Sequence, residues 1–229
     1  MTRRVTAGIG AVVAVAAVVA YPFAVAAGLE RAGPRTLAAP LLVAVALAAL
    51  ATSQRGARLL PLLLRRFGLV VAATGAAIVT DHPAALTLLP SLTSLWLLAI
   101  FASTLRSGPS LVEQFASSMH DGFPDFLAPY CRRVTLVWCA FLAVNAAVAA
   151  YLALAAPPDR WAFYTGFVAY AATAALAAGE YVVHKISFRF YENGWTDRLW
   201  RRWFPPERTA LGRRTLQWQI ARGQAESRR

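Results

Sequence analysis

Long apolar runs separated by short polar stretches make up most of the chain. An α-helix needs about 20 residues to cross a hydrocarbon layer about 30 Å thick, and in lipid each segment must satisfy its own backbone hydrogen bonds, which favours helices. The second run is short and the third contains Arg65 and Arg66. The pattern predicts an all-α, polytopic integral membrane protein, a bundle of about six transmembrane helices. The apolar runs are Val5–Leu29, Thr36–Thr52, Leu59–Thr80, Ala84–Leu105, Val134–Ala156 and Trp161–Val183.

The composition agrees with lipid as the surrounding solvent. Hydrophobic residues make up 58% of the 229 residues, charged residues only 15%, and the mean hydropathy is +0.50, which does not describe a water-soluble core. Cys131 and Cys139 lie about 12 Å apart along one expected helix, too far for a disulfide. With no CxxC spacing or nearby histidine, we expect neither a metal nor a cofactor.

The arginines are distributed unevenly among the loops between the runs. Short cytoplasmic loops retain Lys and Arg, so the distribution predicts six helices with both termini in the cytoplasm. The cytoplasmic set is Arg3, Arg4, Arg55, Arg58, Arg65, Arg66, Arg106, Arg132 and Arg133; the opposite loops contain Glu30, Arg31, Arg35, Asp81, His82, Asp159 and Arg160.

The N-terminal run also has features of a secretory signal peptide. Arg3 and Arg4 precede an apolar region that ends in Ala24-Val25-Ala26, which fits a cleavage site. The apolar stretch continues to Leu29, longer than is usual for such a signal, so we favour a retained helix. Cleavage would leave five helices and an external N-terminus.

Two domains are expected, a transmembrane domain over residues 1–185 and a basic tail over residues 186–229. More than half of the formal net charge of +12 falls after residue 184. Tryptophans alternate with arginines in the tail, a composition typical of the membrane interface, so part of the tail is expected to lie along the membrane. A wholly solvated tail is the alternative. The tryptophans are Trp195, Trp200, Trp203 and Trp218.

The loop over residues 106–131 contains a pattern for a short amphipathic helix on the cytoplasmic surface. Ser110 and Glu113 match a capping box, and Gly122 and Pro124 end the helix. His120 and Asp125 have the spacing of the histidine and carboxylate of glycerolipid acyltransferases. The other sequence blocks of that fold are missing, and Glu113 is expected to be a cap rather than an acid or base.

Polar residues inside the last two runs indicate contacts between helices. Asn145 falls near the middle of its run, on one face with Trp138 and Phe141. An amide is costly against lipid, so Asn145 should point at another helix. In the last run the polar stripe is Gly166, Tyr170, Thr173, Glu180 and His184.

Charged residues at the cytoplasmic ends of these runs form the candidate binding site. Consecutive helices joined by a short turn are antiparallel, so Glu180 and Lys185 should lie level with Arg132 and Arg133. Glu180 is either a structural ion-pair partner or a carboxylate that handles a ligand or proton. The full candidate set, for binding an anionic group, is Arg106, Glu113, Arg132, Arg133, Glu180 and Lys185.

Several short blocks resemble a family of uncharacterised bacterial inner-membrane proteins that are often encoded beside aryl-polyene and fatty-acid-like biosynthesis genes. The blocks are YPFAV, PSLTSLWLLAIFASTLRSGPSLVEQFA, PYCRRVTLVWCAFLAVNAAVAAYLAL, WAFYTGFVAY and GEYVVHK. The Arg/Trp tail beyond Lys185 departs from the family. The matching residues are Glu113, Arg132, Arg133, Thr135, Trp138, Asn145, Trp161, Tyr164, Gly179 and Glu180.

The resemblance implies a pathway rather than a reaction. We expect an accessory or scaffold protein in the synthesis, handling or export of a fatty-acyl or aryl-polyene-like lipid. A membrane-embedded acyl or glycosyl transferase and a small lipid or solute transporter subunit are the alternatives. The expected partners are anionic lipid headgroups and acyl carrier protein or other pathway enzymes. No nucleic-acid motif is present, and Gly- and Ala-rich faces leave a homo-oligomer open.

Overall fold

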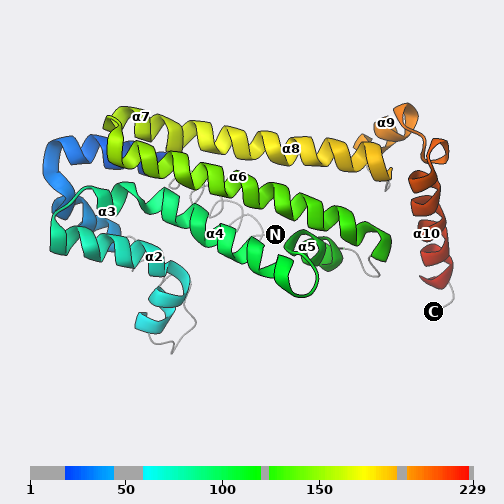
Figure 1. The fold of residues 1–229 in the computed structure, drawn as a ribbon, viewed down its shortest axis with the longest axis horizontal. Helices are drawn as coiled ribbons and strands as arrows, with labels where there is room; N and C mark the ends of the chain where they lie inside the picture. Colours follow the sequence, from blue (N-terminus) through cyan, green and yellow to red (C-terminus); the bar gives the residue numbers. More distant parts are fainter. Residues whose placement is uncertain (1–18, 44–58, 120–123, 190–194, 227–229) are drawn as a thin grey trace, which may run out of the picture. The chain divides into compact units, whose positions relative to one another are not determined.

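The computed structural model describes residues 19–43, 59–119, 124–189 and 195–226 (Figure 1). Helices make up nearly all of these residues and no strand occurs among them, which confirms the all-α class. Residues 19–43 are helical. The later elements are α2 (Leu59–Thr80), α3 (Ala84–Thr87), α4 (Leu89–Arg106), α5 (Leu111–Met119), η1 (Asp125–Leu127), α6 (Ala128–Ala155), α7 (Pro158–Phe163), the π-helix η2 (Tyr164–Val168), α8 (Ala169–Phe188), α9 (Trp195–Trp203), η3 (Pro206–Arg208) and α10 (Ala210–Glu226).

Among the described residues, three helical stretches are long and apolar enough to cross a membrane: Ala84–Thr104, Asp125–Ala155 and Pro158–Phe188. They correspond to the last three predicted runs. The third predicted run is confirmed as helix α2, and residues Gly68–Thr80 within it form a shorter apolar helical stretch. Parts of the first two runs, with Arg3, Arg4, Arg55 and Arg58, lie outside the described residues.

The chain forms two compact units. The first comprises residues 1–114 and 131–170, and the second comprises residues 115–130 and 171–229. Helices α5, α6 and α8 each contribute to both units. The predicted division at residue 185 stays a prediction.

Helices α4 and α6 of the first unit lie side by side and antiparallel (Figure 1). Ser91 Oγ donates a hydrogen bond to the Ala146 carbonyl oxygen at 2.8 Å. Further along, the Phe101 and Trp138 rings lie 6.2 Å apart, and Arg132 donates to the Leu105 carbonyl oxygen at 2.6 Å. Residues with higher numbers in α4 contact residues with lower numbers in α6. One antiparallel register therefore holds over most of both helices.

The helical residues 19–43 bend at Gly33, whose φ of +76° lies in the left-handed region. Glycine adopts that region without steric cost, and Pro34 suits the first turn of the helical segment that follows. The two segments pack closely, because a Cβ on Gly28 would lie 2.3 Å from a Leu37 side-chain atom. Gly33 and Gly28 therefore permit the chain to fold back on itself here.

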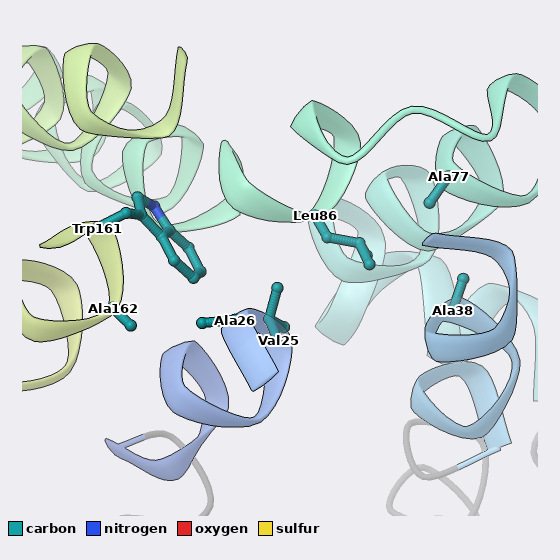
Figure 2. Close-up of a cluster of buried hydrophobic side chains, with 7 residues drawn as sticks. All are labelled: Val25, Ala26, Ala38, Ala77, Leu86, Trp161 and Ala162. Carbon is teal, nitrogen blue, oxygen red and sulfur yellow. The ribbon is translucent and has the colours of Figure 1, made fainter. Parts of the chain in front are cut away.

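The core of the first unit gathers residues from four separate stretches (Figure 2). Trp161 on α7 is 1% exposed and lies among small side chains from the helical residues 19–43 and Leu86 of α3. Its Nε1 has no hydrogen-bond partner within the described residues, so Trp161 contributes through packing. The buried set is Val25, Ala26, Ala38, Ala77, Leu86, Trp161 and Ala162.

In the second unit, α10 begins at a capped turn. Thr209 Oγ1 accepts a hydrogen bond from the Gly212 backbone N–H at 3.0 Å, as an N-cap residue does. A Cβ on Gly212 would lie 2.3 Å from the Pro206 carbonyl oxygen. The Arg214 guanidinium lies over the Phe126 ring, 5.2 Å from its centroid, and joins α10 to η1.

Tyr21 compensates for a proline near the start of α4. Pro90 cannot donate an N–H to the Leu86 carbonyl oxygen, its usual helical acceptor, and the Tyr21 hydroxyl donates to that oxygen at 2.9 Å.

We expect Tyr21→Phe to lower the free energy of unfolding by about 1–3 kcal/mol, because a buried acceptor loses this donor. Reversible denaturation in mixed micelles measures the change.

The matched control is Tyr151→Phe. The Tyr151 side chain is 67% exposed, so loss of its hydroxyl should leave stability unchanged. Equal stability of the two variants would contradict a structural role for the Tyr21 hydrogen bond.

Candidate functional site

Asn145 connects three helical elements inside the first unit. Its Nδ2 donates to Ser94 Oγ of α4 at 2.9 Å, and its Oδ1 accepts from the Tyr164 hydroxyl of η2 at 3.0 Å. Ser94 Oγ in turn donates to the Pro90 carbonyl oxygen at 3.0 Å. The prediction that Asn145 points at another helix is confirmed.

This polar cluster lies at mid-span of two apolar stretches. Asn145 falls near the middle of the uncharged residues 134–155, and Ser94 near the middle of the uncharged residues 84–105. At that depth in lipid, water cannot replace a missing partner. Paired polar groups therefore favour the observed register, since sliding α4 along α6 would separate Ser94 from Asn145.

The π-helix η2 presents Tyr164 to this cluster. A π-turn is rare and often occurs at functional sites. A Cβ on Gly166, also in η2, would lie 2.4 Å from the Phe23 ring, so this turn packs closely on the helical residues 19–43. The close approach and the Tyr164 hydrogen bond hold η2 from two sides.

Arginines gather where the α4–α6 pair ends. Arg132 binds the Leu105 carbonyl oxygen at 2.6 Å, and Arg106 is the last residue of α4. Arg106, Arg132 and Arg133 are all exposed. Arg106 lies in the last turn of α4 and Arg132 reaches a carbonyl oxygen there. Cations near a helix C-terminus are stabilised by the helix dipole, so part of the role of these two arginines is structural. Exposed guanidinium N–H groups can still bind a phosphate or carboxylate.

Length places this end beyond the hydrocarbon layer when α6 spans a membrane. The 28 residues of α6 rise about 42 Å, about 12 Å more than a 30 Å hydrocarbon layer. The excess corresponds to about eight residues at one end. Arg132 and Arg133 lie within the first eight residues of α6.

The predicted capping box of α5 is half formed. Glu113 Oε2 accepts from the Ser110 backbone N–H at 3.3 Å, so Glu113 is a cap, as expected. Ser110 Oγ is buried and has no hydrogen-bond partner within the described residues. The Leu111 backbone N–H instead donates to Thr104 Oγ1 at 3.0 Å, because the last turn of α4 presents that hydroxyl to the start of α5.

In the second unit, Glu180 of α8 accepts a hydrogen bond from the Tyr130 hydroxyl at 3.2 Å. The Tyr130 ring also contacts His184 and Phe188, with centroids 6.0 Å and 4.5 Å away. Glu180 and His184 are one helical turn apart on α8, so Tyr130 meets both. The proposed alternatives for Glu180, an ion-pair partner or a ligand-handling carboxylate, stay predictions.

Lys185 forms a buried ion pair with Asp197 of α9. Lys185 Nζ lies 2.6 Å from Asp197 Oδ1, and the two side chains are 11% and 9% exposed. Lys185 Nζ also lies 5.7 Å from the Tyr181 ring centroid. Through the ion pair, Lys185 holds α9 against the end of α8. The position of Lys185 in the sequence did not indicate this role.

The candidate residues divide between the two units. Arg106, Glu113, Arg132 and Arg133 belong to the first unit, whereas Glu180 and Lys185 belong to the second.

The remaining polar residues of the spans vary in exposure. Trp138 and Thr173 are half-buried and Tyr170 is 40% exposed. His120, like Gly122, lies outside the described residues.

Ser94, Tyr130 and Asp197 were missed by sequence reasoning. Ser94 sits in the middle of an apolar run, a signal comparable to that of Asn145. Tyr130 and Asp197 stand in polar stretches where nothing in the spacing identifies their distant partners.

No cluster of three or more His, Cys, Asp or Glu side chains in the described part of the chain is placed to hold a metal ion. Comparisons with protein-family models, curated proteins and solved structures find no match to this chain. Apart from the resemblance of its sequence blocks, the functional conclusion therefore rests on the residues and their geometry.

Replacing Asn145 should weaken the contact between α4 and α6. We expect Asn145→Leu to lower the free energy of unfolding by about 1–2 kcal/mol, because two interhelical hydrogen bonds in the apolar region are lost. A double-mutant cycle with Ser94→Ala, measured by reversible denaturation in mixed micelles, should give a coupling of about 0.6 kcal/mol or more. Val144→Leu, at an exposed position on α6, is the control. Additive effects of the two substitutions would contradict the coupling.

Removing one charge of the buried pair should release α9. We expect Asp197→Asn to destabilise the docked α9 by about 3 kcal/mol, since it leaves Lys185 buried without its counter-charge. Tryptic cleavage at Arg198 and Arg202 should then accelerate.

The double variant Lys185→Met/Asp197→Leu should restore resistance, because an apolar pair of similar volume often replaces a buried ion pair without loss. Glu207→Gln removes an exposed acid and is the control. Unchanged cleavage in Asp197→Asn would show that the ion pair does not hold α9.

Proposed function

We propose that the protein is an accessory or scaffold protein of the bacterial inner membrane that acts in the synthesis, handling or export of a fatty-acyl or aryl-polyene-like lipid. The pathway is supported by the resemblance of the sequence blocks around Arg132 and Glu180. The membrane setting is supported by three helical stretches of sufficient length and apolarity.

We further propose six transmembrane helices with both termini in the cytoplasm. Three stretches of the described residues are long enough, and α2 contributes a shorter apolar helix. The arginine distribution favours the cytoplasm for the end of the α4–α6 pair that contains Arg106, Arg132 and Arg133.

The observation that carries the functional proposal is the gathering of these three arginines where α4 and α6 end. One guanidinium is committed to the Leu105 carbonyl oxygen, and all three side chains are exposed. Arginine presents several N–H donors in one plane and stays charged, which suits phosphate oxygens. A carrier-linked phosphopantetheine or an acyl-lipid headgroup would present such a phosphate at this depth.

Arg106 and Arg133 provide the sharpest test, because replacing them leaves the Arg132 hydrogen bond to α4 intact. In a strain lacking the gene, we expect the wild type to restore a defined acyl or polyene product in the envelope-lipid mass spectrum. Arg106→Gln/Arg133→Gln, at a matched membrane level, should restore less than about one tenth of it, because each charge-assisted hydrogen bond contributes about 1.5–3 kcal/mol.

The control variant Arg31→Gln/Arg160→Gln removes two exposed arginines from the loops expected on the opposite side, and it should restore the product fully. Binding of phosphopantetheinylated and unmodified acyl carrier protein to the purified protein then separates a carrier from a lipid headgroup. An unchanged lipid profile on gene deletion would contradict the pathway. Full restoration by Arg106→Gln/Arg133→Gln would contradict the arginine site.

A further inference from the structure

Helix α9 has an inner face that is fixed to the end of α8. Asp197 pairs with Lys185, and Trp200, one turn further on, meets the Tyr181 ring edge-on with centroids 6.5 Å apart. Trp200 also contacts Phe204 at 5.8 Å between centroids. Positions 197, 200 and 204 recur at helical spacing, so a single face of α9 makes these contacts.

The attachment to α8 sets the depth of α9 relative to the lipid. No charged residue separates Arg160 from Glu180, so the apolar part of this span ends at Glu180. Lys185 lies five residues further along α8, a rise of about 8 Å. The headgroup layer extends about 5–7 Å beyond the hydrocarbon on each side. The Lys185–Asp197 pair therefore holds α9 at the outer edge of the headgroup layer.

The outer face of α9 combines cationic and apolar side chains. Arg198 and Arg202 are exposed and one helical turn apart. Leu199 and Trp203, the next positions on each turn, are 56% and 71% exposed. Asp197 is the one acid in the α9 sequence, and it is already paired with Lys185, so no acid of α9 offsets the outer arginines.

We propose that α9 is a docking surface for anionic phospholipid, held at the outer edge of the headgroup layer by the Lys185–Asp197 ion pair. Arg198 and Arg202 bind lipid phosphates, while Leu199 and Trp203 enter the boundary between headgroups and acyl chains, where tryptophan is favoured. A lipid surface fits this face better than a soluble acidic partner, because the face is continuous with a membrane span. The proposal is independent of the arginine site in the first unit and uses different residues.

Hydrogen exchange of the full-length protein, one copy per nanodisc, tests the proposal. Exchange of the α9 amides is compared in phosphatidylcholine discs and in discs containing phosphatidylglycerol. We expect slower exchange with phosphatidylglycerol. A basic side chain at an anionic surface favours the bound state about fivefold, so Arg198→Gln/Arg202→Gln should reduce this protection about 25-fold.

Two further variants separate the parts of the proposal. Arg31→Gln/Arg160→Gln removes the same charge elsewhere and should retain the protection. Asp197→Asn keeps both outer arginines but frees α9 from α8, so it should also lose most of the protection.

Equal exchange of wild-type α9 in both kinds of disc would overturn the lipid surface and point to a protein occupant or none. Equal losses in the two double arginine variants would show an effect of net charge alone and would also overturn it. Full protection in Asp197→Asn would overturn the depth-setting role of the ion pair.

Discussion

The requirement that polar groups be paired inside an apolar environment governs the arrangement of the first unit. Three polar contacts join α4 to α6: Ser91 to the Ala146 carbonyl oxygen, Ser94 to Asn145, and Arg132 to the Leu105 carbonyl oxygen. Van der Waals packing alone distinguishes poorly between neighbouring registers of two Ala- and Leu-rich helices. Donors and acceptors at fixed positions do distinguish them, because every shifted register leaves polar groups unpaired.

That register also determines where charge collects. Since α4 and α6 are antiparallel and in fixed register, the C-terminal arginine of α4 and the arginine pair near the start of α6 reach the same end of the first unit. In the second unit, too, a polar contact inside the protein positions charged residues, but the contact is an ion pair. There a buried ion pair joins the polar end of a span to an amphipathic helix, so the depth of a basic surface is determined by a contact inside the protein rather than by lipid alone.

Periodicity and run length were sufficient to predict the helical class, the positions of the three later apolar helices and the interhelical role of Asn145. They did not predict the start of α6, which begins at Ala128 rather than Val134, because its first turns are too polar to belong to an apolar run. An amide within an apolar helix is costly against lipid, so the surrounding sequence alone predicts that it pairs with a polar group on another helix. The sequence could not identify Ser94 as that partner, because serine is common in apolar helices and often bonds to its own helix. It also could not show that Lys185 pairs with Asp197, since that contact depends on how the chain turns between α8 and α9.

The proposed site shows the same limit. Arg106, Arg132 and Arg133 were predicted from charge alone to share one side of the membrane, and the described structure adds that Arg132 binds the end of α4. Glu180 was predicted from its position to face a charged partner or a ligand, and the second unit adds that it accepts a hydrogen bond from Tyr130. A hydroxyl donor of that kind lies too far away in sequence for any local pattern to reveal it.

The central claim is that the α4–α6 pair crosses a bilayer with Asn145 near its middle and the arginines at its edge. Site-directed spin labelling along the exposed face of α6, at Arg133, Val137 and Val144 in a background without cysteine, measures depth directly. The ratio of oxygen accessibility to accessibility for a water-soluble nickel reagent reports the depth of each label. This ratio should rise steadily from residue 133 to residue 144, because each residue lies about 1.5 Å deeper along the helix axis. Uniform access to the aqueous reagent along this face would contradict the account.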